Sequence, residues 1–318
     1  GFVHKGGDFI HLNFGNGTAG LVDAAQLDRI ALHGADLQRD GRADDERLAG
    51  LLQHGHMFQC LVVALVAVGH GIHEGRIAQI PRTDGGQQGV FLFHEALGLG
   101  QDDEVPLVNG MDVDFAKLEE MVDEKTTMVL IQRSKGYSTR KSLSMQTIGR
   151  ICNIVKAKNP DCICFVDNCY GEFVDKQEPL EAGADLVAGS LIKNPGGGIV
   201  EAGGYIAGKE LLVERSANRL TAPGIGSEGG AMFNQHRLIF QGLFMAPSIV
   251  SEAVKGAILA AKVFEDIGFN SAPRYDEART DIIQNIIFGK PEHLEEFCRT
   301  IQSLSPVNGY VTPIPEYI

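Results

Sequence analysis

The sequence predicts an α/β protein whose core is a mainly parallel sheet with helices on both faces. From about residue 105 onward, short apolar segments of strand length follow one another along the chain. Segments with helical periodicity lie between and after them. Apolar strands that alternate with helices are typical of βαβ units, whose parallel strands are covered on both faces. The strand segments are residues 126–132, 162–167, 185–192 and 203–208.

Helical segments complete this pattern. Residues 144–158 place Ile148, Ile151, Cys152 and Val155 on one face, which predicts a helix between the first two strands. Residues 248–267 predict a helix that links the sheet to a smaller unit, and we expect two helices of that unit. They are predicted at 276–288 and 292–303. The direction of the strand at 203–208 is left open.

Residues 1–100 differ in composition from the remainder of the chain. They contain no serine and no tyrosine, a single lysine, a single proline, and eight of the ten histidines. Serine is among the commonest residues of globular proteins, so its absence over this length is unusual. Two explanations are open: an unusual N-terminal domain, or a segment translated in the wrong frame or from the wrong strand. We favour the second, which translation of the coding DNA in six frames would test.

Charge and apolar content limit the classes of partner. The net charge is −13 and the isoelectric point is near 5.2, which argues against nucleic acid and anionic membrane surfaces. The longest apolar run, residues 57–69, is too short to cross a bilayer, and no targeting segment is evident. The six cysteines fit reduced packing thiols of a cytoplasmic protein. Two histidine pairs, at 54–56 and 70–73, lack a convincing carboxylate partner, so no metal site is predicted.

An acid and an amine are expected at the same edge of the sheet. Asp167 ends the strand at 162–167, and Lys193 follows the strand at 185–192. In open α/β sheets, ligands bind outside the carboxyl ends of the strands. Because a buried acid and a buried amine need partners, two interpretations are open from the residues alone: a structural ion pair and a ligand site.

The residues around Lys193 match what pyridoxal 5'-phosphate requires of a protein. That cofactor needs an amine for a Schiff base, an acid for its pyridine nitrogen, donors for its phosphate and close packing on its ring. Lys193 and Asp167 supply the first two, and Ser190 supplies a hydroxyl near the phosphate. Pro195 and the glycines at 196–198 allow a tight turn. We expect burial and nearby positive charge to lower the pKa of Lys193.

Several motifs carry a resemblance to a known family. They are Asp-Asn-Cys-Tyr-Gly-Glu-Phe at 167–173, Gly-Ser-Leu-Ile-Lys-Asn-Pro-Gly-Gly-Gly at 189–198 and Gly-Gly-Tyr-Ile-Ala-Gly at 203–208. Further matches are Gln-Arg-Ser-Lys-Gly-Tyr at 132–137, Arg-Leu-Thr-Ala-Pro-Gly at 219–224 and Gln-Gly-Leu-Phe-Met-Ala-Pro at 241–247. From about 105 to 318, the chain resembles the methionine gamma-lyase-like family, also called the aluminium-resistance or cystathionine beta-lyase-like family.

The resemblance implies the fold-type-I architecture of pyridoxal phosphate enzymes, which is like that of aspartate aminotransferase. It implies that Lys193 is the Schiff-base lysine, that Asp167 pairs with the pyridine nitrogen and that Ser190 binds the phosphate. Arg133 and Tyr170 are proposed as weaker contacts to the cofactor or the substrate. The implied domains are an atypical segment at 1–100, for which mistranslation or disorder is the hypothesis, a cofactor-binding large domain at 101–247, and a linking helix with a partial small domain at 248–318.

The implied activity is carbon–sulfur lysis of a cystathionine-like or methionine-like amino acid, by α-proton abstraction and β- or γ-elimination. Two alternatives are open: a catalytically incomplete fragment, and another fold-type-I activity such as aminotransfer or aldol cleavage. Two family features are not found, the Ser-Gly-Thr-His-type phosphate loop and most of the small domain. We expect a small amino-acid substrate and, from the family, a homodimer or homotetramer.

Overall fold

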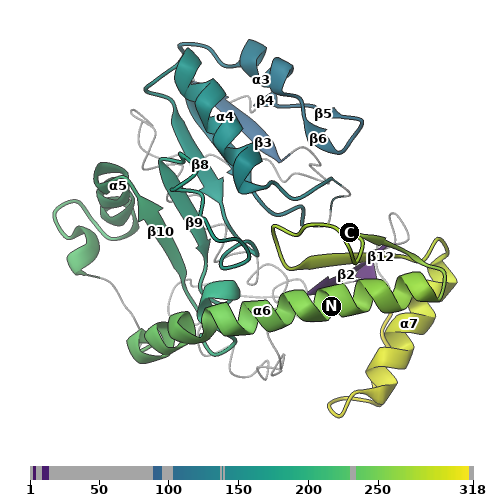
Figure 1. The fold of residues 1–318 in the computed structure, drawn as a ribbon. Helices are drawn as coiled ribbons and strands as arrows, with labels where there is room; N and C mark the ends of the chain where they lie inside the picture. Colours follow the sequence, from purple (N-terminus) through teal and green to yellow (C-terminus); the bar gives the residue numbers. More distant parts are fainter. Residues whose placement is uncertain are drawn as a thin grey trace, which may run out of the picture.

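A six-stranded sheet forms the centre of the described chain (Figure 1). The structure is a computed structural model and describes residues 3–4, 9–13, 89–94, 103–136, 138, 140–229 and 234–314. The strand order is β10-β9-β8-β7-β3-β4. The strands are β3 (Val90–His94), β4 (Asp103–Glu104), β7 (Thr126–Gln132), β8 (Ile163–Asp167), β9 (Leu186–Ser190) and β10 (Gly204–Gly208).

The predicted parallel core is formed by three of these strands. β7, β8 and β9 are parallel neighbours, and all four strand segments predicted from sequence are present. β10 runs antiparallel to β9, a direction that the sequence pattern does not determine. β3, which lies within the atypical segment, pairs antiparallel with β7, and β4 pairs with β3. The domain boundary placed at residue 100 stays a prediction.

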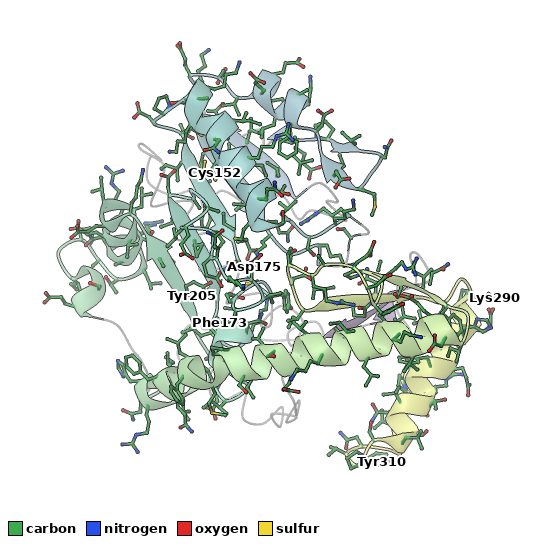
Figure 2. The ribbon with its side chains drawn as sticks, viewed as in Figure 1. Cys152, Phe173, Asp175, Tyr205, Lys290 and Tyr310 are labelled. Carbon is green, nitrogen blue, oxygen red and sulfur yellow. The ribbon has the colours of Figure 1, made fainter. Side chains whose placement is uncertain are left out.

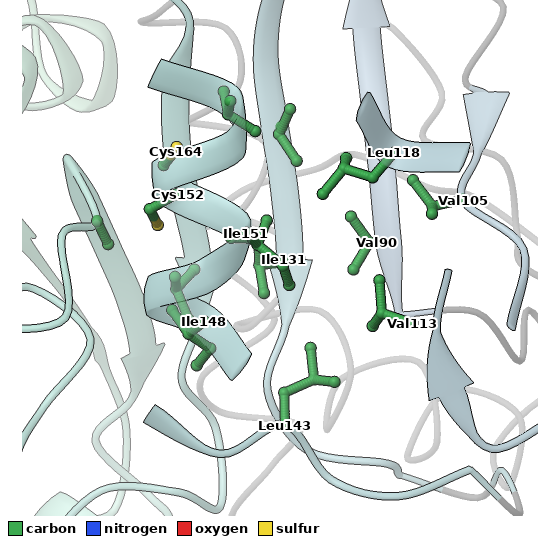
Figure 3. Close-up of a cluster of buried hydrophobic side chains, with 14 of the residues drawn as sticks. Val90, Val105, Val113, Leu118, Ile131, Leu143, Ile148, Ile151, Cys152 and Cys164 are labelled. Atoms are coloured by element: carbon green, nitrogen blue, oxygen red, sulfur yellow. The ribbon is translucent and has the colours of Figure 1, made fainter. Parts of the chain in front are cut away.

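Helices cover both faces of the sheet. On one face, α3 (Phe115–Met121) and α4 (Met145–Lys158) pack against buried side chains of the central strands (Figure 3). The α4 side chains predicted from periodicity, among them Ile148 and Ile151, are fully buried there, and Ser144 caps the helix by accepting from the N–H of Thr147. On the other face, Leu212 of α5 (Glu210–Leu220) packs with Phe165 and Leu186. The result is a helix–sheet–helix arrangement.

A second unit lies beside the sheet's carboxyl end (Figure 1). It contains a four-stranded sheet in the order β1-β2-β12-β11 and the helix α7 (Pro291–Leu304), which confirms the helix predicted at 292–303. Its strands are β1 (Val3–His4), β2 (Phe9–Asn13), β11 (Asn270–Ala272) and β12 (Ile283–Ile287). A separate small hairpin joins β5 (Leu107–Val108) to β6 (Asp112–Val113).

The helix predicted at 276–288 is wrong. Residues 283–287 form β12, which pairs with β2 on one side and β11 on the other. The apolar pairs Ile282–Ile283 and Ile286–Ile287 have a spacing that a helix also accepts. In the structure, the intervening Gln284 and Asn285 are buried as well. A strand buried on both faces has no exposed face, so its apolar and polar residues need not alternate. The β-branched isoleucines favour the strand over the helix.

The linking helix is longer than predicted. α6 spans His236–Asp266, and begins twelve residues before the predicted start at 248. Its small buried residues let it lie against other elements, and it contacts the short 3-10 helix Asn194–Gly196 as well as β11 and β12. Among the helices that the structure describes, α6 is the one whose length and composition could cross a membrane. The expectation of no membrane partner stays a prediction.

A buried ion-pair centre joins the helices to the sheet at the end away from the predicted site. Asp185 lies just before β9, and its carboxylate accepts from Lys156 Nζ at 2.7 Å, Lys209 Nζ at 2.6 Å and the N–H of Cys164 at 2.8 Å. The carboxyl is 4% exposed. Burial alone raises the pKa of Asp185, but the hydrogen bonds from Lys156, Lys209 and Cys164 outweigh burial and lower it.

We expect Asp185→Asn to lower the free energy of unfolding by about 2 kcal/mol at pH 7, because it leaves two ammonium groups and an N–H without their anionic partner. Since the folded-state pKa lies below the ordinary 3.8, this stabilisation is present above pH 3.8 and is lost as the pH falls through the folded value. Urea unfolding at pH 7 and pH 3 measures both effects.

Asp112→Asn is the matched control. Asp112 pairs with Lys141 at 3.3 Å, but both side chains are more than half exposed, so its loss is expected to change stability by less than about 0.5 kcal/mol. Equal effects of the two substitutions would contradict the role of Asp185.

Candidate active site

The carboxyl ends of β7, β8 and β9 form one edge of the sheet. Strand pairing places Gln132 of β7 beside Asp167 of β8, and Asp167 beside Ala188 of β9. Arg133 therefore follows the first strand, Asp167 ends the second, and Ser190 ends the third. Because ligands of open α/β sheets bind at this edge, these residues lie where the sequence predicts a site.

Asp167 is fixed by the backbone around it. The residue is 6% exposed. Its Oδ1 accepts from the N–H of Cys169 at 3.1 Å, and its carbonyl accepts from the N–H of Arg133 at 3.0 Å. The chain then turns sharply, and Tyr170 adopts a positive φ of 69°. That conformation is costly for a large side chain and is concentrated at functional sites.

Lys193 lies against this turn from the neighbouring strand. Its backbone N–H donates to the carbonyl of Ser190 at 3.3 Å, and it immediately precedes the 3-10 helix Asn194–Gly196. The Lys193 Nζ lies 4.2 Å from the centroid of the Tyr170 ring, an arrangement typical of a cation–π contact. Lys193 and Tyr170 are therefore brought together, and Asp167 lies near enough to raise the pKa of Lys193 electrostatically.

The expected lowering of the Lys193 pKa is wrong. Burial by itself lowers the pKa of Lys193, but the electrostatic interactions with Cys169, Tyr170 and Asp167 outweigh burial, and the pKa is raised above its usual 10.5. A hydrogen bond with Tyr170 acts in the same direction. The physical reason is the sign of the neighbours: Cys169, Tyr170 and Asp167 favour the ammonium, whereas the prediction assumed nearby positive charge.

Ser190 and the glycine turn hold the backbone beside Lys193. Ser190 is 2% exposed at the end of β9. Gly197 has a positive φ of 54°, and a Cβ there would overlap the carbonyl of Gly242 in α6. A Cβ at Gly242 would in turn overlap the carbonyl of Gly196. The glycines therefore serve the close approach of α6 to the chain that follows Lys193. The role of Ser190 as a phosphate ligand stays a prediction.

Arg133 follows β7, and its side chain is held by the loop after β8. The residue is fully buried, and its Nη1 donates to Asn168 Oδ1 at 2.7 Å and to Glu178 Oε2 at 3.3 Å. Its Nε and Nη2 atoms are buried without a hydrogen-bond partner. The guanidinium thus binds the loop after β8, and its proposed contact with cofactor or substrate stays a prediction.

Sequence reasoning gave no role to a buried polar network under the site. The Tyr205 hydroxyl donates to Glu172 Oε1 at 3.0 Å, and the Asn168 amide donates to the Tyr205 oxygen at 3.2 Å. Figure 2 labels Tyr205 on β10 and Phe173 in the loop that follows β8. Asn168 and Glu172 lie in the motif at 167–173, and Tyr205 lies in the motif at 203–208. No spacing along the chain indicates that the loop acid and the tyrosine of the antiparallel strand meet.

Glu172 is the acid of this network, and its pKa is raised. Burial raises the pKa of Glu172 to about 8, and the Tyr205 hydrogen bond opposes the shift only in part. Its Oε2 has no hydrogen-bond partner. A Cβ at Gly189 would overlap both Glu172 Oε1 and the Tyr205 ring, which explains a glycine inside β9. Glu172 is therefore largely protonated at neutral pH.

Comparisons with known proteins agree with this architecture. The model of the methionine gamma-lyase family matches residues 97–318. The uncharacterized protein YnbB of Bacillus subtilis (strain 168) is 45% identical over 214 residues, which are 67% of this chain and 51% of that protein. The chain thus spans about half the length of this curated relative.

Two crystal structures are similar as well. One, from Listeria monocytogenes and described as a candidate cystathionine beta-lyase involved in aluminium resistance, is 48% identical with a TM-score of 0.65. The match covers 68% of this chain and 53% of that one. The other, a carbon–sulfur lyase involved in aluminium resistance from Clostridium novyi, is 47% identical with a TM-score of 0.63 and covers 67% and 51%. Together with the sheet and the motifs at its carboxyl edge, these matches show that the chain belongs to the methionine gamma-lyase family.

Proposed function

We propose that this protein is a pyridoxal 5'-phosphate-dependent carbon–sulfur lyase. Its substrate is a sulfur amino acid of the cystathionine or methionine type, and its reaction is α-proton abstraction followed by β- or γ-elimination. The observation that carries the proposal is the meeting of Lys193, Tyr170 and Asp167 at the carboxyl edge of the sheet. The names of the similar lyases support the same reaction class.

The side chains at this edge fit the cofactor. They comprise an amine, a carboxylate, an aromatic ring and a hydroxyl, supplied by Lys193, Asp167, Tyr170 and Ser190. Lys193 would hold the cofactor covalently, Asp167 would pair with its pyridine nitrogen and Ser190 would bind its phosphate, with Tyr170 and Arg133 as further contacts. When bound, pyridoxal phosphate supplies an electron sink that stabilises negative charge on the α-carbon of an amino acid.

The chain's own residues then do three things. Lys193 Nζ moves a proton, first from the substrate α-carbon and then toward the departing sulfur. The N–H of Cys169 orients the Asp167 carboxylate, so that its Oδ1 keeps one position. The Tyr170 ring holds the Lys193 amine at the carboxyl edge, 4.2 Å from the ring centroid.

Covalent attachment of the cofactor is the direct test. The purified chain is incubated with pyridoxal 5'-phosphate, reduced with borohydride and digested, and the modified peptide is identified by mass spectrometry. We expect a visible absorption band and modification at Lys193. Because attachment needs the unprotonated amine and the pKa of Lys193 is raised, the rate of attachment should increase with pH between 6 and 9. Absence of a fixed cofactor at every pH would contradict the proposal.

Product analysis separates the reaction classes. Cystathionine, methionine and cysteine are each incubated with the loaded chain, and ammonia and 2-oxo acids are measured. Pyruvate with ammonia indicates β-elimination, and 2-oxobutanoate with ammonia indicates γ-elimination. A 2-oxo acid without ammonia indicates aminotransfer instead, and a chain that carries cofactor but releases no product would be catalytically incomplete.

We further propose that the protein acts on this small substrate in the cytoplasm as a homodimer or homotetramer. Membership of the family is the reason for proposing the cytoplasm and the homo-oligomer. Phe240 and Phe244 of α6 are 70% and 87% exposed, and exposed aromatic side chains of this kind are typical of self-association surfaces. Sedimentation equilibrium measures the state directly, and a monomer at micromolar concentration would contradict it.

A further inference from the structure

Two buried segments meet beside Lys193. One is the 3-10 helix Asn194–Gly196, which begins at the residue after Lys193. The other is the turn after β8, which carries Tyr170. Asn194 joins the two segments: its Nδ2 donates to the carbonyl of Glu172 at 3.0 Å, and the residue is 4% exposed. The side chain of Asn194 therefore links the backbone at Lys193 to the turn that holds the aromatic ring.

An asparagine is a costly residue at this position. The Asn194 Oδ1 is buried without a hydrogen-bond partner. An unpaired buried acceptor lowers stability, whereas an apolar side chain of the same shape does not carry that cost. Asn194 also precedes Pro195, and helical backbone is disfavoured for a residue before proline. The contribution that an apolar side chain could not make is the Nδ2 donor to the Glu172 carbonyl.

The turn that Asn194 contacts is held near both of its ends. Glu178 Oε1 accepts from the N–H of Phe173 at 2.9 Å, and Glu178 Oε2 accepts from the amide of Asn168 at 3.0 Å. The Nη1 of the buried Arg133 donates to Asn168 Oδ1 at 2.7 Å. Because side-chain networks of this kind stiffen a loop, a segment that is bonded to the turn is fixed relative to it.

The other backbone hydrogen bonds of Lys193 are local. Its N–H donates to the carbonyl of Ser190 at 3.3 Å, and its carbonyl accepts from the N–H of Gly196 at 3.0 Å. These bonds fix Lys193 relative to the end of its own strand and the start of the 3-10 helix. The bond from Asn194 differs, because it runs to a segment that follows a neighbouring strand.

We propose that Asn194 is a positioning residue, which holds the Lys193 amine over the Tyr170 ring. The Lys193 Nζ lies 4.2 Å from the ring centroid. The chemical role of the amine rests on the proposed function, whereas its position rests on these contacts. Without the Nδ2 bond, the segment after Lys193 can move relative to the turn, and a displacement of about 1 Å at a reacting group lowers a rate by about 10²-fold.

The ring current of Tyr170 gives a direct readout in the chain without cofactor. Lysine labelled with ¹³C at Cε is incorporated, and the Lys193 resonance is assigned by its loss in Lys193→Arg. Because the end of this side chain lies over an aromatic ring, we expect its Cε protons to resonate upfield of those of exposed lysines. Asn194→Leu should lose this upfield shift. An upfield shift that persists in Asn194→Leu would overturn the proposal.

Asn159→Leu is the matched control. The Asn159 Nδ2 also donates to a backbone carbonyl, that of Thr126 at 2.9 Å, but Thr126 begins β7 and lies at the opposite end of the sheet. Both substitutions remove an amide donor and lower stability, yet only Asn194→Leu should change the Lys193 resonance. Equal loss of the shift in both variants would overturn the proposal. Asn194→Ala removes the same donor without added apolar bulk, and should lose the shift even if the leucine variant does not fold.

The loaded protein supplies a second readout. Asn194→Leu is expected to lower kcat for the sulfur amino acid by about tenfold or more with a smaller change in KM, because a displaced amine slows proton transfer more than it weakens binding. Asn159→Leu should leave both values unchanged. If the wild-type chain fixes no cofactor on Lys193, the proposed function fails, but loss of the ring-current shift in Asn194→Leu would still support the positioning role. If cofactor is fixed and Asn194→Leu keeps both the shift and the wild-type kcat, the positioning role fails alone.

Discussion

Lys193→Ala is expected to abolish borohydride-fixed pyridoxal phosphate and to lower elimination activity by roughly 10³-fold or more. The substitution removes the amine that would carry the cofactor and the atom that would move the substrate proton, and each role has a large effect on rate. Absorbance after reduction, peptide mapping and 2-oxo acid release measure the two losses separately.

Two further variants distinguish the amine from its charge. Lys193→Arg keeps the positive charge beside Asp167 and the Tyr170 ring, so the fold should be preserved. Its guanidinium is not a nucleophile at neutral pH, and we expect the same loss of fixed cofactor. Lys176→Ala, at an exposed lysine of the loop after β8, should leave both measurements unchanged. Cofactor fixed to the Lys193→Arg chain at the wild-type level would show that another lysine carries it.

Glu172→Gln is expected to stabilise the protein at alkaline pH. The folded-state pKa of Glu172 is raised to about 8 from an ordinary 4.5. A raised pKa means that the stability due to the bound proton is complete below pH 4.5 and is lost as the pH rises through 8. Glutamine does not ionise and keeps an oxygen for the Tyr205 hydroxyl. We therefore expect the variant to exceed the wild type by about 4 kcal/mol at pH 8 and by less than about 1 kcal/mol at pH 5.

Urea unfolding at pH 5, 6, 7 and 8 measures this difference. Glu214→Gln, at an exposed position of α5, is the control and should show no pH-dependent gain. A constant difference between Glu172→Gln and wild type across the pH range would mean that Glu172 is ionised in the folded protein. Tyr205→Phe, measured in the same series, should be less stable than the wild type at pH 5, because the Glu172 carboxyl loses its hydrogen-bond donor.

Local patterns were sufficient for the strands that carry the site. β7, β8 and β9 are apolar runs buried on both faces, and such runs can be recognised one at a time. The α4 helix was equally accessible, since its apolar residues repeat at helical spacing. The pattern at 276–288 was ambiguous, because isoleucine pairs separated by two polar residues satisfy both a helix and a doubly buried strand. Only pairing with β2 and β11 decides for the strand.

The sequence by itself determined the family, the parallel core and the placement of Lys193 and Asp167 at one edge of the sheet, because parallel strands put their carboxyl ends together. Only the tertiary structure decided the charge state of that edge. The pKa of Lys193 depends on Cys169, Tyr170 and Asp167 lying around it, and the pKa of Glu172 depends on complete burial. Electrostatic interactions depend on distance and desolvation in space, and neither is encoded by residue spacing along the chain.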